Sequence, residues 1–338
     1  MRYSHVCIEG VVHHLPEVVI PTTAIERMLS ETYERLRISP GTLEAMTGVA
    51  KRRFWKEGVT PSALATRAAE ELFEQTGFDP SKVSALVSTS VCKDYLEPSV
   101  ASLVQGNLGL QPNCLNFDVG NACLGFMTGM SVVANMIELG QIQAGLVVVG
   151  EGSRDVTLAT TRRLQRPETT FDEFRENLAT LTLGSASCAM LLVHEDISTT
   201  GHRLMGGLSM AATDHNRLCI GTAEQMHTDA PKLLSEGVSL AHQNWIQVRS
   251  DLNLEPERIK TYAMHQVGKA NHEAVIHALD LPEERTIRLY PDYGNVGAAG
   301  VPLAMSMAKE QGKFNDGDTV MLMGIGSGLN TQMMQVVW

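Results

Sequence analysis

Apolar runs of strand length alternate with helical stripes along the first half of the chain. Continuous or nearly continuous apolar runs lie at residues 3–12, 83–91, 114–119, 145–150 and 187–194. Between them, apolar positions recur at helical spacing, as in the i, i+4, i+8 stripe of Leu64, Ala68 and Leu72. The pattern predicts the order strand, helix, strand, helix, strand, strand.

The second half of the chain repeats this order. Its predicted strands lie at residues 208–210, 261–265, 286–290, 319–323 and 331–338. The repetition predicts an internally duplicated α/β fold, with one half over residues 1–195 and the other over residues 196–338. A polar stretch at residues 152–183 interrupts the first half, and we interpret it as a cap over the site or as a plain surface insertion.

A cysteine stands at the centre of the first half. The segment Asn116–Phe126 predicts a buried strand, a tight turn and a helix from about Cys123 to Leu139. A cysteine in the first turn of a helix lies near unpaired backbone N–H groups and the positive end of the helix dipole, which favour the thiolate. Cys123 is therefore a candidate acyl-accepting nucleophile, although free cysteines are also common core residues.

Composition narrows the class of protein. The 338 residues are 43% hydrophobic and 19% charged, as in a compact globular enzyme. The net charge of −11 argues against a nucleic-acid-binding protein. Six cysteines without metal-ligand spacing predict neither a zinc site nor a disulfide framework. The N-terminus lacks a signal-peptide core and no apolar run reaches membrane-spanning length, so we expect a cytoplasmic protein with reduced thiols.

The duplication predicts which other polar residues join Cys123. Sites in α/β folds gather at the carboxyl ends of strands, where His265 and the turn Gly294–Gly297 with Asn295 are expected. Each signal alone is common in structural roles. The glycine-rich segment Gly324–Gly328 lacks the Lys-Ser/Thr of a phosphate loop and precedes a strand, so we expect it to approach a carbonyl closely and offer N–H groups.

Together, these motifs resemble the thiolase superfamily, and most closely its ketoacyl synthase III branch, over essentially the whole chain. The resemblance implies a five-layered αβαβα fold, a homodimer, and acyl transfer from coenzyme A or acyl carrier protein to Cys123 without a metal or bound cofactor. It also implies that His265 and Asn295 assist acyl transfer, and that the backbone N–H groups of Cys123 and Ser327 form the oxyanion hole.

The segment Thr47–Arg52 resembles the early turn of the same branch. Its basic residues are followed by Phe54 and Trp55, and such a cluster could hold a nucleotide phosphate and stack on its base. Arg52 is therefore a candidate contact for coenzyme A. The alternative is a solvated loop.

Glu97 departs from the pattern of the initiating ketoacyl synthases, which typically carry an apolar residue there. A carboxylate could remove an α-proton, which a condensation without decarboxylation requires. With Glu97 included, the chain resembles the acyl-CoA condensing thiolases of bacterial long-chain olefin biosynthesis. This resemblance implies head-to-head Claisen condensation of two fatty acyl-CoAs to a 2-alkyl-3-oxoacyl product, with Glu97 supplied by the partner subunit. Alternatively, Glu97, or Asp94 nearby, only stabilises the first turn of a helix.

Three other functions compete with this one. The nearest is a decarboxylative 3-oxoacyl-[acyl-carrier-protein] synthase III of fatty acid or polyketide biosynthesis. Hydrolysis of the thioester is another, and a non-catalytic acyl-carrier-binding subunit is the third. Expected partners are fatty acyl-CoA substrates and, in addition, acyl carrier protein or downstream pathway enzymes. No nucleic acid is expected among them.

Overall fold

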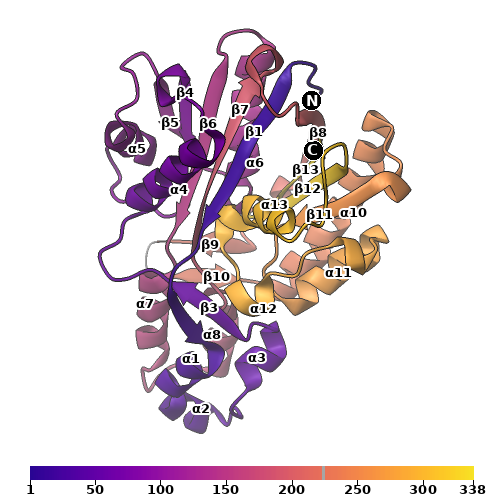
Figure 1. The fold of residues 1–338 in the computed structure, drawn as a ribbon. Helices are drawn as coiled ribbons and strands as arrows, with labels where there is room; N and C mark the ends of the chain where they lie inside the picture. The colour runs from indigo at the N-terminus through magenta and orange to yellow at the C-terminus, as the bar shows by residue number, and fades with distance from the viewer. Residues whose placement is uncertain (223–224) are drawn as a thin grey trace.

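A nine-stranded mixed sheet runs through the molecule. The computed structural model describes residues 1–222 and 225–338. The strands follow the order β11-β12-β13-β8-β1-β7-β6-β4-β5 (Figure 1). Their bounds are β1 (Val6–His14), β4 (Ala85–Ser88), β5 (Leu115–Asp118), β6 (Ala144–Glu151), β7 (Ala186–His194), β8 (Arg203–Ala211), β11 (Ile259–Met264), β12 (Thr319–Gly326) and β13 (Asn330–Val337).

The sheet consists of two equivalent halves. In the first, the strand order β5-β4-β6-β7-β1 has parallel pairing on both sides of β4 and antiparallel pairing on both sides of β7. The order β11-β12-β13-β8 repeats this pattern, with Thr286 forming a parallel bridge to Tyr262 in place of a fifth strand. The two halves meet where β1 and β8 pair. The predicted duplication is confirmed.

Helices cover both halves and fill the space between them. The helices are α4 (Pro61–Thr76), α5 (Val100–Leu108), α6 (Gly125–Glu138), α10 (Ala230–Leu252), α11 (Lys269–Leu279) and α13 (Gly300–Glu310). One buried cluster joins α4 and α5 to the first half-sheet, and another joins α10 and α11 to the second. The central cluster contains α6 and α13 together with strands of both halves. The layers are thus α, β, α, β, α.

A lobe lies below one end of the sheet (Figure 1). It contains α1 (Thr22–Met28), α2 (Ser30–Leu36), α3 (Thr42–Thr47), α7 (Arg154–Leu164), α8 (Phe171–Glu176), α9 (Leu178–Leu181) and the hairpin of β2 (Val18–Pro21) and β3 (Lys51–Phe54). Its own buried cluster includes Leu29, between α1 and α2, and Leu43 of α3, together with Leu164, Phe174 and Leu181 from the polar stretch. The stretch at 152–183 is therefore packed as part of a lobe, and its role over the site stays a prediction.

One predicted strand is wrong. Residues 286–290 contribute only the bridge at Thr286, and Tyr290–Tyr293 form the short helix α12. The buried Gln266 side chain takes the place of a strand neighbour. Its amide oxygen accepts from the N–H groups of Leu289 (2.8 Å) and Tyr290 (3.2 Å), and its amide nitrogen donates to the Ile287 carbonyl (2.6 Å).

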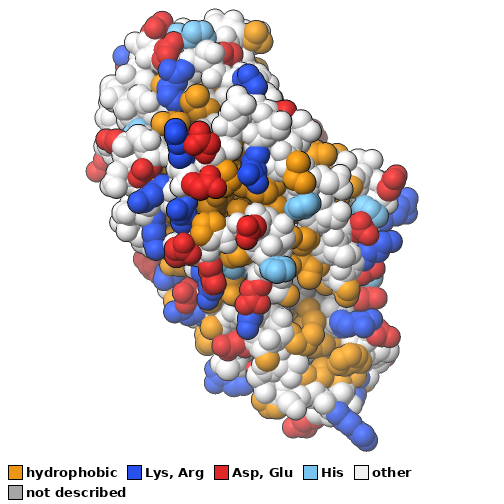
Figure 2. All heavy atoms as spheres, turned by 90° about the vertical axis from the view of Figure 1, so that its right-hand side faces the viewer, with side chains coloured by type: hydrophobic (Ala, Val, Ile, Leu, Met, Phe, Trp, Pro, Cys, Tyr) orange, Lys and Arg blue, Asp and Glu red, His pale blue; other side chains and the backbone are white. Residues whose placement is uncertain are grey.

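The surface carries mixed charge. On the face shown in Figure 2, acidic and basic side chains are interspersed, with hydrophobic side chains exposed between them. No single-sign stripe of the kind that nucleic-acid binding uses crosses this face.

Within residues 1–222 and 225–338, no helix is both long and apolar enough to cross a membrane.

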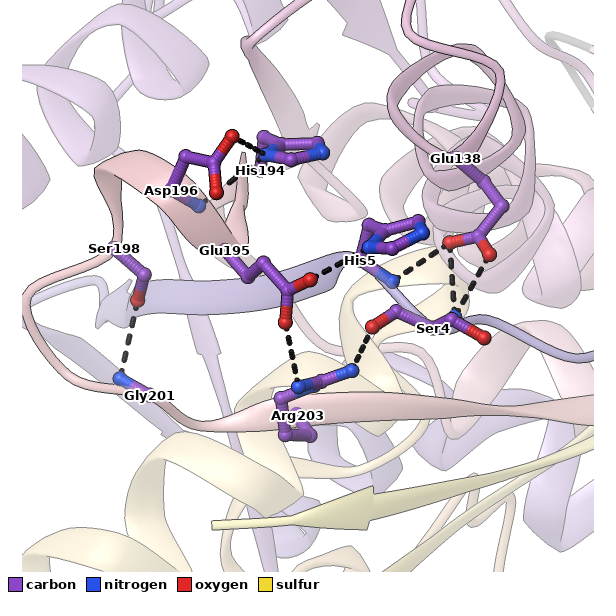
Figure 3. A network of polar contacts seen from close by, with 9 residues as sticks. All are labelled: Ser4, His5, Glu138, His194, Glu195, Asp196, Ser198, Gly201 and Arg203. Carbon is purple, nitrogen blue, oxygen red and sulfur yellow. Dashed lines mark hydrogen bonds and ion pairs between the residues drawn. The ribbon is translucent and has the colours of Figure 1, made fainter.

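A polar network fastens the start of β1 to both of its neighbours (Figure 3). Glu138, at the end of α6, accepts from the backbone N–H groups of Ser4 (2.8 Å) and His5 (2.9 Å). Glu195, which follows β7, bonds to the His5 ring (2.6 Å) and to Arg203 of β8 (2.9 Å). The network therefore links the two halves where β1 meets β8.

This network predicts a pH-dependent contribution to stability. The hydrogen bond between His5 and Glu195 raises the pKa of His5 above 6.5 and lowers the pKa of Glu195 below 4.5. The His5 contribution is full below pH 6.5 and is lost as pH rises through the raised pKa. The Glu195 contribution is present above pH 4.5 and is lost as pH falls through the lowered one.

We expect His5→Gln to lower the melting temperature most between about pH 4.5 and 6.5, and less at higher pH. Thermal melts of both proteins across this range measure the difference. Added salt should shrink it, because the pair is exposed. A difference that is constant with pH and salt would contradict the ionic origin.

Candidate active site

Cys123 lies in a tight turn between β5 and α6. The turn is the 3₁₀ helix η2 (Ala122–Leu124), and Ala122 has a positive φ of 45°. The Asn121 amide donates to Thr128 Oγ1 (2.9 Å) and so ties the turn to the first turns of α6. Because α6 begins at Gly125, Cys123 precedes the helix rather than lying within its first turn.

The predicted low pKa of Cys123 is wrong. Burial raises the pKa of the thiol to about 12, and the charge of Glu151 and the nearby Cys219 act in the same direction. Only the backbone N–H of the turn favours the thiolate, and desolvation outweighs it. The sulfur therefore carries its proton in the resting site, and attack on a thioester needs a neighbouring base.

His265 directly follows β11 and supplies a candidate base. Its backbone N–H donates to the Met323 carbonyl (2.9 Å), which fixes it beside β12. The side chain is buried, and neither ring nitrogen has a hydrogen-bond partner in the described part of the chain. Burial lowers the pKa of His265 to about 4, so the ring is neutral at pH 7. It can donate from one nitrogen and accept at the other.

Asn295 is held through its backbone by the end of the lobe. Its N–H donates to the Thr182 carbonyl (2.9 Å), and its carbonyl accepts from the Gly184 N–H (2.8 Å). The side-chain oxygen accepts from the Gly297 N–H (3.0 Å). Gly297 begins the 3₁₀ helix η7 (Gly297–Ala299), which leads into α13 as η2 leads into α6.

The hairpin between β12 and β13 approaches the Cys123 turn closely. A Cβ on Gly326 would lie 3.3 Å from the backbone nitrogens of both Cys123 and Leu124. The Asn330 amide donates to Asn121 Oδ1 (3.1 Å) and closes the contact from the other strand. The glycine segment thus lies against the Cys123 turn, and its expected approach to a carbonyl stays a prediction. Ser327 follows Gly326 directly, and its role as an oxyanion donor stays a prediction.

The turns η2 and η7 lie close to each other and to the segment that carries His265. The turn η2 contacts η7 and β12, and an added Cβ on Gly125 would lie 3.6 Å from the Cβ of Ala298. An added Cβ on Gly300, at the start of α13, would lie 2.6 Å from Nδ1 of His265. The elements that carry Cys123, His265 and Asn295 therefore meet at the carboxyl ends of the strands, where the duplication predicts them.

Glu97 lies on a loop whose tip is exposed. Tyr95 is 62% exposed and Leu96 is 99% exposed, and Glu97 is exposed beside them. Helix α5 begins at Val100 with Ser99 as its N-cap, so Glu97 lies outside the first helical turn. The interpretation of Glu97 as a helix-stabilising charge is wrong.

Both ends of this loop are anchored. Asp94 accepts from the backbone N–H (3.0 Å) and the hydroxyl (2.6 Å) of Ser62. Asp118 pairs with Lys93 (3.0 Å) and accepts from the N–H groups of Val100 (3.2 Å) and Ala101 (2.9 Å). The fixed ends position the exposed tip.

Glu151 is a residue of the site that the sequence patterns did not single out. It ends β6 with only 4% of its surface exposed. Its carboxylate accepts from the N–H groups of Val91 (2.9 Å) and Cys92 (3.3 Å) and acts electrostatically on Cys123. The sequence feature that could have indicated it is a charged residue directly after the apolar run at residues 145–150.

Arg52 lies in the interior. It is 0% exposed, donates to Thr22 Oγ1 (2.9 Å) and to the Leu181 carbonyl (2.8 Å), and burial lowers its pKa to about 10. This geometry joins the two parts of the lobe and gives no support to a coenzyme A contact. Its neighbours are also engaged, since Lys51 pairs with Asp292 (3.1 Å) and Arg53 lies over the Tyr293 ring.

Metal-ligating groups do not gather at this site. Across the ranges that the structure describes, no three His, Cys, Asp or Glu side chains are placed to hold a metal ion. All six cysteines are free.

Two sequence-family profiles match the chain. Residues 117–164, which include Cys123, match "3-Oxoacyl-[acyl-carrier-protein (ACP)] synthase III". Residues 250–338, which include His265, Asn295 and Ser327, match "3-Oxoacyl-[acyl-carrier-protein (ACP)] synthase III C terminal". The fold and the site thus define a condensing enzyme with the duplicated thiolase fold.

Relatives that align over the whole chain identify the family within this class of condensing enzymes. The chain is 37% identical to the acyl-CoA:acyl-CoA alkyltransferase of Xanthomonas campestris, with all of both chains covered, and 37% identical to that of Shewanella oneidensis, also with all of both covered. A crystal structure of cerulenin-bound Xanthomonas campestris OleA matches with a TM-score of 0.98 at 37% identity, covering 100% of this chain and 98% of that one. The beta-ketoacyl-[acyl-carrier-protein] synthase III of Ruegeria pomeroyi is 28% identical over 98% of both chains. The chain belongs to the acyl-CoA:acyl-CoA alkyltransferase family.

The contact between α13 and His265 predicts the effect of one added methyl group. In Gly300→Ala the new Cβ would lie 2.6 Å from Nδ1, so the ring must move. We expect the free energy of unfolding to fall by about 1–3 kcal/mol and turnover to fall with it, although alanine favours the helix.

Gly106→Ala is the matched control. Gly106 lies within α5 with open space around its Cβ position, so its substitution should be neutral or stabilising by about 0.5–1 kcal/mol. Denaturant melts and turnover assays compare the two. A Gly300→Ala protein with unchanged stability and turnover would show that the ring is not held against α13.

Proposed function

We propose that this chain catalyses non-decarboxylative, head-to-head Claisen condensation of two fatty acyl-CoAs through an acyl thioester on Cys123. The product is a 2-alkyl-3-oxoacyl thioester. The observation that carries this proposal is the meeting of the Cys123 turn, a neutral His265 with unpartnered ring nitrogens, and Asn295. Relatives that share the whole chain are named acyl-CoA:acyl-CoA alkyltransferases.

Acylation is the first step of the proposed mechanism. His265 accepts the Cys123 proton as the sulfur attacks the thioester carbon of the first acyl-CoA, and the coenzyme A thiol leaves with that proton. The backbone N–H groups of Cys123 and Ser327 stabilise the oxyanion. The close approach of Gly326 to the Cys123 nitrogen supports this placement.

Condensation is the second step. Glu97 removes an α-proton from the second acyl-CoA, and the carbanion attacks the carbonyl carbon of the Cys123 thioester. The Cys123 sulfur leaves as the thiolate, and return of the proton that Glu97 removed restores both the thiol and the carboxylate. His265 and Asn295 bond to the thioester oxygen on which charge develops. An OleA structure of Xanthomonas campestris with bound lauric acid and lauroyl-CoA, at 37% identity and a TM-score of 0.97, supports the fatty acyl-CoA substrate.

The exposed loop supports a homodimer in which each subunit supplies Glu97 to its partner. The loop exposes Val91, Tyr95 and Leu96 within six residues, and a group of exposed apolar side chains is typical of an interaction surface. Because the loop is anchored at Asp94 and Asp118, its tip can reach outward without losing its position. We infer that the tip enters the partner's site and that Glu97 becomes desolvated there.

Removal of the nucleophile tests the first step. Cys123→Ala should fold normally but form no acyl-enzyme when incubated with a single fatty acyl-CoA, as read by intact-protein mass spectrometry. Cys114→Ala, which removes a buried thiol of the core, should still show the mass shift. A mass shift that persists in Cys123→Ala would refute the assignment. No shift in the wild type would favour a non-catalytic carrier-binding subunit.

Removal of the proposed base separates the two steps. We expect Glu97→Gln to keep the acyl-enzyme but to lose at least about 100-fold in condensation, because general-base catalysis contributes on that order. Product analysis with acyl-CoA alone measures the second step. A wild-type enzyme that made product only with a malonyl thioester would be a decarboxylative synthase instead, and release of free fatty acid alone would indicate hydrolysis.

Mixed dimers test whether Glu97 crosses the interface. Subunits with Cys123→Ala and subunits with Glu97→Ala are inactive separately, but a mixed dimer restores one complete site if Glu97 comes from the partner. Random mixing should then recover about a quarter of wild-type condensation. If Glu97 served its own subunit, mixing would recover none.

A further inference from the structure

Glu151 is a buried carboxylate that the proposed mechanism does not use. Its oxygens accept from the N–H groups of Val91 (2.9 Å) and Cys92 (3.3 Å). None of the ion pairs in the described part of the chain includes Glu151. A carboxylate buried without a cation is costly, so its position needs a reason beyond packing.

The two donors at residues 91 and 92 begin the loop that carries Glu97. Beyond them, Asp94 and Asp118 hold the loop on either side of its tip. Glu151 thus anchors the loop where it leaves the sheet, and Cys92 lies five residues before Glu97. Its own backbone is fixed, because the Trp55 indole donates to the Glu151 carbonyl (2.9 Å).

The other side of the carboxylate meets the turn after Asn295. A Cβ on Gly297 would lie 3.4 Å from Oε1 of Glu151, and Gly297 donates to the Asn295 side chain. Because Gly297 begins η7, the carboxylate lies against the turn that leads into α13. One side chain therefore bridges the Glu97 loop and the Asn295 turn, beside Cys123.

We propose that Glu151 is a positioning residue that sets the Glu97 loop for the condensation step while leaving acylation of Cys123 intact. The proposal rests on the proposed function insofar as Glu97 is the base. Glu151 touches no reacting atom and acts through the loop. Since a displacement of about 1 Å can cost about 100-fold in rate, loosening of Val91 and Cys92 should reach Glu97.

Glu151→Gln tests this in the full-length enzyme. Glutamine keeps the size of the side chain, but it places an NH₂ donor where a carboxylate oxygen accepts from the N–H groups of Val91 and Cys92. We expect condensation of fatty acyl-CoA to fall about 10- to 100-fold, acyl-enzyme formation to stay within about twofold, and amide hydrogen exchange over residues 91–99 to accelerate.

Glu9→Gln is the matched control. Glu9 is also a buried glutamate that accepts from a backbone N–H, that of Thr199 (3.1 Å), and from the Ser198 hydroxyl (3.0 Å), but it lies on β1. Its substitution should lower stability without changing exchange over residues 91–99 or the ratio of condensation to acylation. This control separates loop positioning from a general loss of buried hydrogen bonds.

Mixed dimers locate the effect. Glu151→Gln is added to the Cys123→Ala subunit, which only supplies Glu97, and condensation at the partner's Cys123 should fall about tenfold. Unchanged exchange over residues 91–99, or unchanged condensation in Glu151→Gln, would overturn the proposal. If the wild type itself fails to condense, the proposed function fails, while hydrogen exchange still decides whether Glu151 holds the loop.

Discussion

The site depends on close backbone contact between the turns that precede the two central helices. Only glycine allows it at several points, since a Cβ on Gly300 would strike the His265 ring and one on Gly326 would crowd the nitrogens of Cys123 and Leu124. Gly125 similarly approaches the Thr89 carbonyl, with 2.7 Å between that oxygen and an added Cβ. These contacts bring the ends of the two half-sheets together, and the candidate catalytic side chains project from the elements that meet there.

Desolvation then sets the charge state of that site. It outweighs the backbone N–H that favours the thiolate at Cys123 and keeps the thiol protonated, and it keeps His265 neutral. A protonated thiol beside a neutral imidazole is stable in a buried site, whereas a thiolate–imidazolium pair would have to be desolvated as two charges. In the proposed mechanism, the proton moves from the Cys123 sulfur to a ring nitrogen of His265 when a thioester binds. The Glu151 carboxylate is held by backbone N–H groups rather than by an ion pair. Its charge therefore adds to the electrostatic cost of a thiolate at Cys123 in the resting site.

Peripheral segments complete the site by holding loops rather than by adding reactive groups. The end of the lobe fixes Asn295 through Thr182 and Gly184. The Glu97 loop is fixed at both ends and exposed at its tip, which suits a group that acts outside its own subunit. Arg52 contributes to the interior of the lobe, where its guanidinium donates to the Thr22 hydroxyl and to the Leu181 carbonyl.

Local patterns along the chain were sufficient to predict the duplicated order of strands and helices, because the apolar periodicity of each element reflects the face it buries. The equivalent places of Cys123 and Asn295 followed from that duplication, and Glu97 from its departure from a family pattern. Features that depend on neighbours distant in sequence could be determined only from the tertiary structure. The side chain of Gln266 replaced the strand predicted at 286–290, and burial raised the pKa of Cys123. The lobe enclosed Arg52, and Glu151 came to lie against Val91 and Gly297. Desolvation and hydrogen bonding arise from the assembled environment, which a residue's own segment does not contain.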